Sequence, residues 1–233
     1  SEEVKVTGKA VSGTEGVSEG KKSSKFFEYR DVPKGFIFSL FDLSVEKGDK
    51  YLTFSANRVR QDDARYIVAL GDYGKYSLDF TYDKIPHRFS FFGRMLYIEA
   101  NPGIYILADP LQAALQNVVG DGGVNASLNI SKARSLLGDY IAGAHGIDLG
   151  LQRNKGTLNL SYSPTVPLNI NLRVSREERT GTRPYSASFG FSHVVEVPEP
   201  IDYKTIDVNA SVEYSRQWGT VRAGVFVSLF DNE

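Results

Sequence analysis

The residues that could do chemistry are few and lie far apart in the sequence. The three histidines are His87, His145 and His193, and adjacent carboxylates occur at Asp62-Asp63 and Glu177-Glu178. Both carboxylate pairs stand in charged stretches that are typical of solvated loops. No catalytic triad spacing, phosphate-binding loop or cluster of metal ligands is present. We therefore expect a chain that is not an enzyme and that binds no metal or cofactor of its own.

Composition narrows the function classes further. The chain has no cysteine, which excludes cysteine-ligated zinc sites, iron–sulfur clusters and covalent haem attachment. The 27 Lys and Arg residues balance 28 Asp and Glu residues, so no net positive field would attract nucleic acid. No apolar run reaches the roughly 18 residues that a transmembrane helix needs. This length criterion does not apply to a membrane β-barrel, because the strands of such a barrel are only half apolar.

Long strands dominate the predicted structure, most clearly in residues 206–215 and 221–229. In both runs apolar and polar side chains alternate, and a short break at 217–219 predicts an antiparallel hairpin. A strand that crosses a bilayer needs about 9–11 residues, whereas soluble strands average about 5–6. An aliphatic face opposite a polar face suits a wall between lipid and a wet lumen. A soluble sandwich with its apolar face toward a core is the alternative.

The same alternation recurs along the chain and predicts about ten or eleven strands, with turns near residues 46–49, 72–75 and 153–156. Pro86 is expected to end one strand, and residues 177–184 are expected to form a charged loop. Soluble sandwiches have shorter strands, so the set favours an all-β, antiparallel transmembrane β-barrel with long strands, short turns and one long loop.

Three parts are expected: a flexible polar N-terminal arm over residues 1–25, with a short strand near 4–11; a barrel segment over 26–233; and, within it, a partly helical loop over 93–140. Asp109 can cap a helix whose first position is Pro110, and a second short helix is expected within 131–140. The first residues lack the features of a signal peptide. If the protein is exported, that peptide is not part of this chain.

Several stretches resemble the MtrB/PioB family of outer-membrane β-barrels that associate with decahaem cytochromes. They occur in the family's order and span most of the chain. They are SSKFFEYRD at 23–31, GDYGKY at 71–76, FTYDKIPH at 80–87, PEPIDYKT at 198–205 and SLFDN at 228–232.

The resemblance implies a sheath in the bacterial outer membrane. In that family the barrel encloses a periplasmic multihaem c-type cytochrome, which often meets a second multihaem cytochrome outside the cell, and electrons cross through the haems. Haem c is then expected in the partner and not in this chain. Family members are longer, and a bore for a folded cytochrome needs about 16–18 strands or more. We therefore expect this chain to be the N-terminal part of a larger barrel.

Eight polar side chains on the alternating strands are candidates for facing the lumen and a partner. They are Asp79, Asp83, Asn169, Asn171, Arg173, Asp207, Glu213 and Arg222. A porin or substrate channel without a cytochrome would have the same wall, and a soluble β-rich binding module is the third reading. The sequence does not choose the direction of electron flow.

Overall fold

The computed structural model describes residues 3–16, 18, 23–101, 103–119, 126–189 and 193–232. Eleven strands and two helices lie in this part of the chain. In chain order they are β1 (Val4–Glu15), β2 (Gly35–Lys47), β3 (Lys50–Asn57), β4 (Arg65–Asp72), β5 (Tyr76–Arg94), β6 (Tyr97–Asn101), β7 (Ile104–Leu107), α1 (Asp109–Val119), α2 (Ala126–Gly143), β8 (Gly146–Thr165), β9 (Leu168–Phe189), β10 (His193–Arg216) and β11 (Gly219–Asn232).

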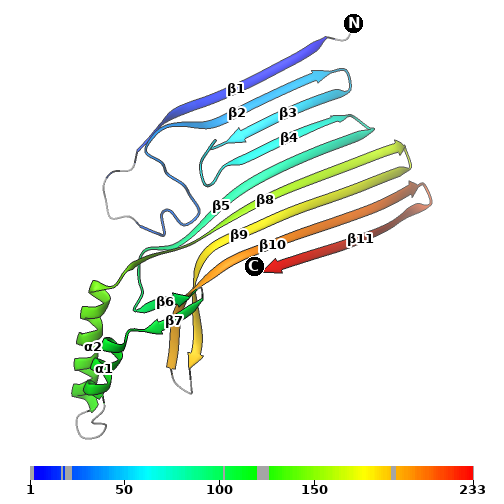
Figure 1. The fold of residues 1–233 in the computed structure, drawn as a ribbon. Helices are drawn as coiled ribbons and strands as arrows, with labels where there is room; N and C mark the ends of the chain where they lie inside the picture. Colours follow the sequence, from blue (N-terminus) through cyan, green and yellow to red (C-terminus); the bar gives the residue numbers. More distant parts are fainter. Residues whose placement is uncertain are drawn as a thin grey trace. The chain divides into compact units, whose positions relative to one another are not determined.

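Nine of these strands form one sheet in the order β1-β2-β3-β4-β5-β8-β9-β10-β11 (Figure 1). Neighbours in the sheet are neighbours in the chain, except where the segment between β5 and β8 intervenes. Short turns join β2 to β3, β4 to β5, β8 to β9 and β10 to β11, and Figure 1 shows all four at the same end of the sheet. In the described residues β1 and β11 are the edges, so the sheet is not closed.

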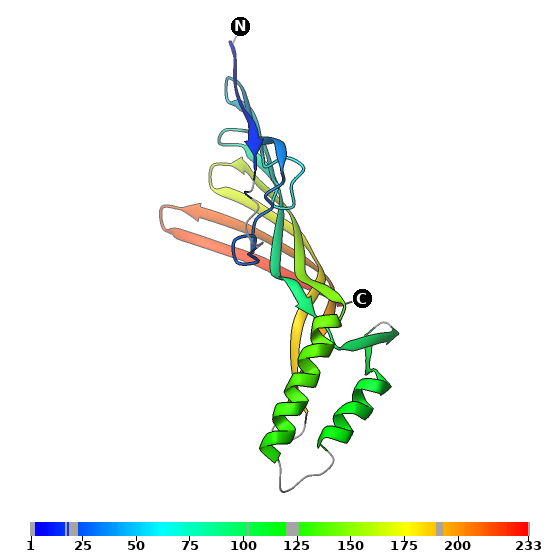
Figure 2. The ribbon, with the colours of Figure 1, turned by 90° about the vertical axis from the view of Figure 1, so that its left-hand side faces the viewer.

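The chain divides into two compact units. The first, here called the wall unit, is Ser1–Arg88, Leu151–Gly181 and Ile201–Glu233. The second, here called the helical unit, is Phe89–Gly150 and Thr182–Pro200. It contains the β6–β7 hairpin and the two helices, which lie side by side (Figure 2). Strands β5, β8, β9 and β10 supply residues to both units.

The wall unit has no conventional hydrophobic core. Among its described residues, the buried apolar side chains are Ala56, Ala64 and Ile201. Large apolar side chains such as Phe80, Val225 and Leu229 are instead more than a third exposed to solvent, at 42%, 58% and 61%. A soluble sandwich would bury these groups between two sheets. The single layer therefore needs another medium, or another surface, against its apolar side.

The helical predictions are confirmed in type and extended in length. Helix α1 begins at Asp109 with Pro110 in its first turn, so the predicted start is right to within one residue. The Ala108 carbonyl accepts the first helical hydrogen bond, from the N–H of Gln112, which makes Asp109 the first helical residue and not the cap. The second helix is α2, which is longer than the predicted segment within 131–140. The β6–β7 hairpin was not predicted, and residues 102 and 120–125 of the expected loop lie outside the described residues.

The prediction of a flexible arm over residues 1–25 is wrong for Val4–Glu15. These residues form β1, which pairs antiparallel with β2 over its whole length and is longer than the short strand expected near 4–11. Backbone pairing with β2 satisfies the strand's hydrogen bonds despite its polar composition. Residues 1, 2, 17 and 19–22 of the predicted arm lie outside the described residues.

The turn predicted at 153–156 and the loop predicted at 177–184 are both wrong. They lie inside the continuous strands β8 and β9. Charged side chains marked these stretches as solvated, but here they pair across the strands: Arg153 Nη2 lies 2.7 Å from Glu177 Oε2. Strand β9 continues beyond the expected loop to Phe189, and residues 190–192 lie outside the described residues.

Pro86 does not end its strand, because β5 continues to Arg94. Backbone N–H groups two residues apart leave a strand on the same side. The N–H of Lys84 donates to Ala64 O at 2.9 Å, and the N–H of Arg88 donates to Glu28 O at 2.9 Å. Both acceptors lie in connecting segments, beyond the last pair of the β4–β5 ladder. The N–H that Pro86 lacks would point to this same side, where no neighbouring strand needs a donor, and β5 can therefore continue through the proline.

Candidate partner-facing surface

The registers of the first strands separate an apolar face from a polar one. Directly paired residues share a face, and Phe54 pairs with Val68, which in turn pairs with Phe80. On the other face Ala69 pairs with Asp79, and Arg65 pairs with Asp83. The alternation predicted for this half of the chain is therefore confirmed as a two-sided sheet.

The hairpin of β10 and β11 repeats this separation, except that Phe226 and Phe230 of β11 lie on the polar face. Val208 pairs with Val227 on the apolar face. Glu213 pairs with Arg222 on the polar face, where Asp207 also lies, two positions along from Asn209. Opposite charges directly across an antiparallel pair attract each other. The terminal hairpin thus carries three of the eight candidate residues on one side.

Contacts between the middle strands show that the two faces are continuous across the wall unit. Phe80 of β5, Leu158 of β8 and Val174 of β9 line one cavity and so share the apolar face. On the opposite face, Ser175 Oγ of β9 donates to Asp207 Oδ2 of β10 at 3.5 Å. Because residues alternate along each strand, all eight candidates lie on the polar face. They are Asp79, Asp83, Asn169, Asn171, Arg173, Asp207, Glu213 and Arg222.

Several candidates are held by neighbours on the same face. The Asp83 carboxylate lies 3.1 Å from Arg65 Nε. Asn169 Nδ2 donates to Ser163 Oγ at 2.9 Å, and Asn171 Nδ2 donates to Asn169 Oδ1. Arg222 Nη2 lies 3.3 Å from Ser211 Oγ. Such side-chain ladders fix the orientation of the polar surface before any partner binds.

The sequence analysis missed the most strongly charged part of this face. Glu177 is half-buried and accepts from three cations: Arg153 at 2.7 Å, Lys155 at 3.4 Å and Arg179 at 3.1 Å. Three positive charges against one negative charge leave two in excess. Arg153 and Lys155 keep the odd-numbered alternation of residues 157–163, which was the signal that could have identified them. We call these four residues the Glu177 cluster.

The segment before β2 is held against β5. The Tyr29 ring stacks on the His87 ring at 4.6 Å, and the Tyr29 hydroxyl lies 3.2 Å from His87 Nε2. Lys25 Nζ donates to the Glu28 carboxylate at 2.5 Å. That hydrogen bond lowers the pKa of Glu28 and raises the pKa of Lys25. This segment covers the side of β5 that β4 leaves unpaired.

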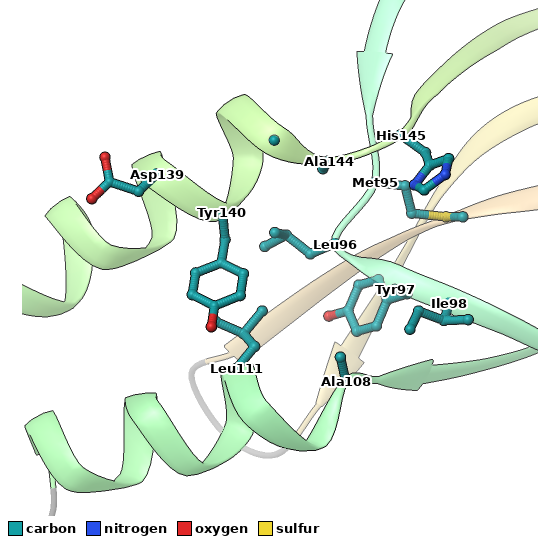
Figure 3. A pocket seen from close by; sticks show the side chains of 11 residues that line it. Met95, Leu96, Tyr97, Ile98, Ala108, Leu111, Asp139, Tyr140, Ala144 and His145 are labelled. Carbon is teal, nitrogen blue, oxygen red and sulfur yellow. The ribbon is translucent and has the colours of Figure 1, made fainter.

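A pocket of about 410 Å³ lies within the helical unit (Figure 3). Tyr140 of α2 points toward Leu111 of α1, which is fully buried. Asp139 and His145 also line the pocket, but they lie at opposite sides of it. No acid–base pair forms there, and we regard the pocket as a gap in the packing between helices and hairpin.

The described residues contain no group of three or more His, Cys, Asp or Glu side chains that could hold a metal ion. In the same part of the chain, neither helix is both long and apolar enough to cross a membrane. His87 and His145 are not brought together: His87 belongs to the wall unit and His145 to the helical unit.

A comparison with protein families decides what kind of sheet this is. A family model described as an outer membrane beta-barrel porin, MtrB/PioB, matches residues 19–233. The chain belongs to the MtrB/PioB family. No curated protein matches it significantly. Its sheet is part of an outer-membrane β-barrel, and the unclosed edges fit a portion of a wider MtrB/PioB barrel.

In an outer-membrane barrel of the MtrB/PioB family, the two faces of the sheet have different surroundings. The apolar face borders lipid and the polar face borders the lumen. On the lipid face Tyr66 pairs with Tyr82 at one end of the β4–β5 ladder, and Tyr76 lies at the other end. Tyr76 and Tyr82 are six steps apart along the strand, or about 20 Å. Aromatic residues at both ends of an apolar band of roughly 25 Å are typical of such barrels.

Proposed function

We propose that this chain forms part of a barrel wall that encloses a multihaem c-type cytochrome and positions it for electron transfer across the outer membrane. The observation that carries the proposal is the continuous polar face of the wall unit in a member of the MtrB/PioB family. Such a face offers hydrogen bonds and charge to a folded partner along its length. The wall itself would perform no bond chemistry and would hold no haem, in keeping with the absence of cysteine.

The partner-facing contacts would be made by the eight candidate residues together with the Glu177 cluster. The cluster's two excess positive charges suit an anionic patch on the partner, such as carboxylates of its polypeptide or of its haem propionates. The polar ladders around Asn169 would order the surface in advance, which lowers the entropic cost of binding.

Copurification tests this function. The native full-length protein should be isolated from outer membranes in mild detergent together with a haem-staining polypeptide. Replacing Arg153 and Lys155 by Glu should reduce the haem recovered per barrel, because it reverses the charge of the cluster. A double replacement by Gln is the milder control. If the unaltered barrel never carries haem, the sheath function is wrong.

A porin without a cytochrome is the second candidate, favoured by the description of the family itself. Ion conductance separates the two functions. A free porin conducts when it is purified from the membrane and inserted into a planar bilayer. A sheath should conduct only after its partner has been removed.

A further inference from the structure

A shallow groove of about 320 Å³ lies on the lipid face of the wall unit. Its residues come from three neighbouring strands, β5, β8 and β9, and all occupy even-numbered positions. The apolar part is formed by Phe80, Leu158 and Val174. Since this face borders lipid in an outer-membrane barrel, the medium that meets the groove is the membrane.

One end of the groove is polar. Asn154, Arg176 and Glu178 line it, and Arg176 is paired with the Glu178 carboxylate. The Arg176 side chain is nevertheless 62% exposed and that of Glu178 is 36% exposed. An arginine has five N–H donors, so this ion pair leaves most of its donors available. A cation and an anion therefore stand side by side at the end of an apolar groove.

A glycine makes the hollow. Gly156 lies in the interior of β8, where glycine weakens a strand and often marks the close approach of a ligand. A Cβ built at Gly156 would lie 3.8 Å from Phe80 and 4.0 Å from Tyr82, which is ordinary van der Waals contact. Neither steric crowding nor a positive φ requires glycine here. The empty volume above the Phe80 ring is what the glycine provides.

We propose that this groove binds one phosphatidylethanolamine molecule as a specific lipid site. An acyl chain lies along Phe80 and Leu158, over Gly156. The phosphate accepts charge-assisted hydrogen bonds from Arg176, and the ammonium donates to Glu178. The zwitterionic headgroup matches the paired charges, whereas a purely anionic headgroup would meet the Glu178 carboxylate unfavourably. The inference depends on the lipid orientation of this face and does not depend on the partner in the lumen.

Native mass spectrometry of the full-length protein tests the site. The protein is reconstituted in nanodiscs that contain phosphatidylethanolamine with phosphatidylglycerol and lipid A, and the lipids that stay bound after release are counted. We expect one retained phosphatidylethanolamine. Gly156→Leu fills the groove and should weaken its binding about tenfold, as should Arg176→Gln through the lost charged hydrogen bonds.

Two controls separate the site from general effects on the lipid surface. Arg173→Gln makes the same charge change on the same strand but on the polar face, and should leave lipid retention unchanged. Tyr162→Leu alters the lipid face of β8 outside the groove, and should also leave it unchanged. Unaltered phosphatidylethanolamine binding by Gly156→Leu would overturn the site. Preferential retention of lipid A or phosphatidylglycerol by the unaltered protein would overturn the assignment of the headgroup.

Discussion

The wall unit and the helical unit share four strands, whose apolar alternation is opposite in the two units and changes a few residues inside the wall unit. In the wall unit the apolar residues of β5 and β9 occupy even positions over 76–82 and 168–174. Farther along the same strands they occupy odd positions, over 85–91 and 185–189. Strands β8 and β10 change in the same way, near 152–157 and 202–205. In β5, β8 and β9 the change falls beside ion pairs, namely Asp83 with Arg65 and Glu177 with Arg153 and Lys155.

This difference shows that strand length overstates the part of a strand that crosses the membrane. Strand β10 has 24 residues, whereas a tilted strand needs only about 9–11 to span a bilayer. In β5, β8, β9 and β10 the band with lipid on one face corresponds to the even-numbered apolar alternation within the wall unit. Beyond the change of alternation the apolar side chains lie on the opposite face of the strand. We therefore do not expect the apolar residues there to face lipid.

The largest expected effect comes from a charge on the lipid face. Val208→Arg places a cation in the apolar band and should destabilise the barrel in a bilayer by roughly 2–4 kcal/mol. Asn209→Arg, one position along on the polar face, should change stability little. Unfolding in urea from lipid vesicles measures both. Equal effects for the two variants would mean that the faces are assigned wrongly.

Enlarging the pocket in the helical unit should destabilise that unit and leave the wall unit unchanged. Leu111→Ala removes a fully buried side chain beside the existing pocket. We expect a loss of about 2 kcal/mol in the packing of α1 against its neighbours. Proteolysis between residues 89 and 150 should become faster, while urea unfolding of the wall unit stays unchanged. A matching loss in the wall unit would mean that the two units unfold as one.

The Glu177 cluster should stabilise the wall unit by a smaller amount. Glu177→Gln leaves Arg153, Lys155 and Arg179 close together without their shared anion. We expect a loss of about 1–2 kcal/mol in the free energy of unfolding, and a dependence on salt because the remaining repulsion is screened. Glu178→Gln is the control, since its exposed pair with Arg176 should contribute less than about 1 kcal/mol.

The smallest effect should be a pH dependence of the segment before β2. The pKa of Glu28 is lowered in the folded protein by its hydrogen bond from Lys25. Its stabilising contribution is therefore complete above the ordinary pKa of a glutamate and is lost as the pH falls through the folded pKa. Hydrogen exchange of the Arg88 amide, which donates to Glu28 O, should report this loss. Glu28→Gln should abolish the pH dependence.

The sequence predicted the parts of the fold that depend on local patterns. Alternation identified both strands of the β10–β11 hairpin, and the Asp109-Pro110 pair located the start of α1 to within one residue. The same alternation placed the eight candidate residues on one face. What they contact in the lumen stays a prediction.

The remaining errors have a common physical cause. Asn154 and Lys155 precede Gly156, which is a typical turn composition, yet Lys155 is held in β8 by Glu177 of the next strand. Proline usually ends a strand because the neighbouring strand needs the N–H that proline lacks. Pro86 lies where that side of β5 faces a connecting segment, so the strand continues. Both cases depend on a partner that is distant in the sequence, so no local pattern could have revealed them.

The position of Pro86 also has a consequence for assembly. Beyond Asp83 the β4 side of β5 has no strand beside it, only connecting segments whose carbonyls accept from Lys84 and Arg88. Until those segments dock, this edge of β5 is bare, and a bare strand edge invites pairing with another polypeptide. A proline ring in that stretch removes the donor that such an intruding chain would require. We expect the residue to protect the newly exported protein against aggregation before it inserts into the bilayer.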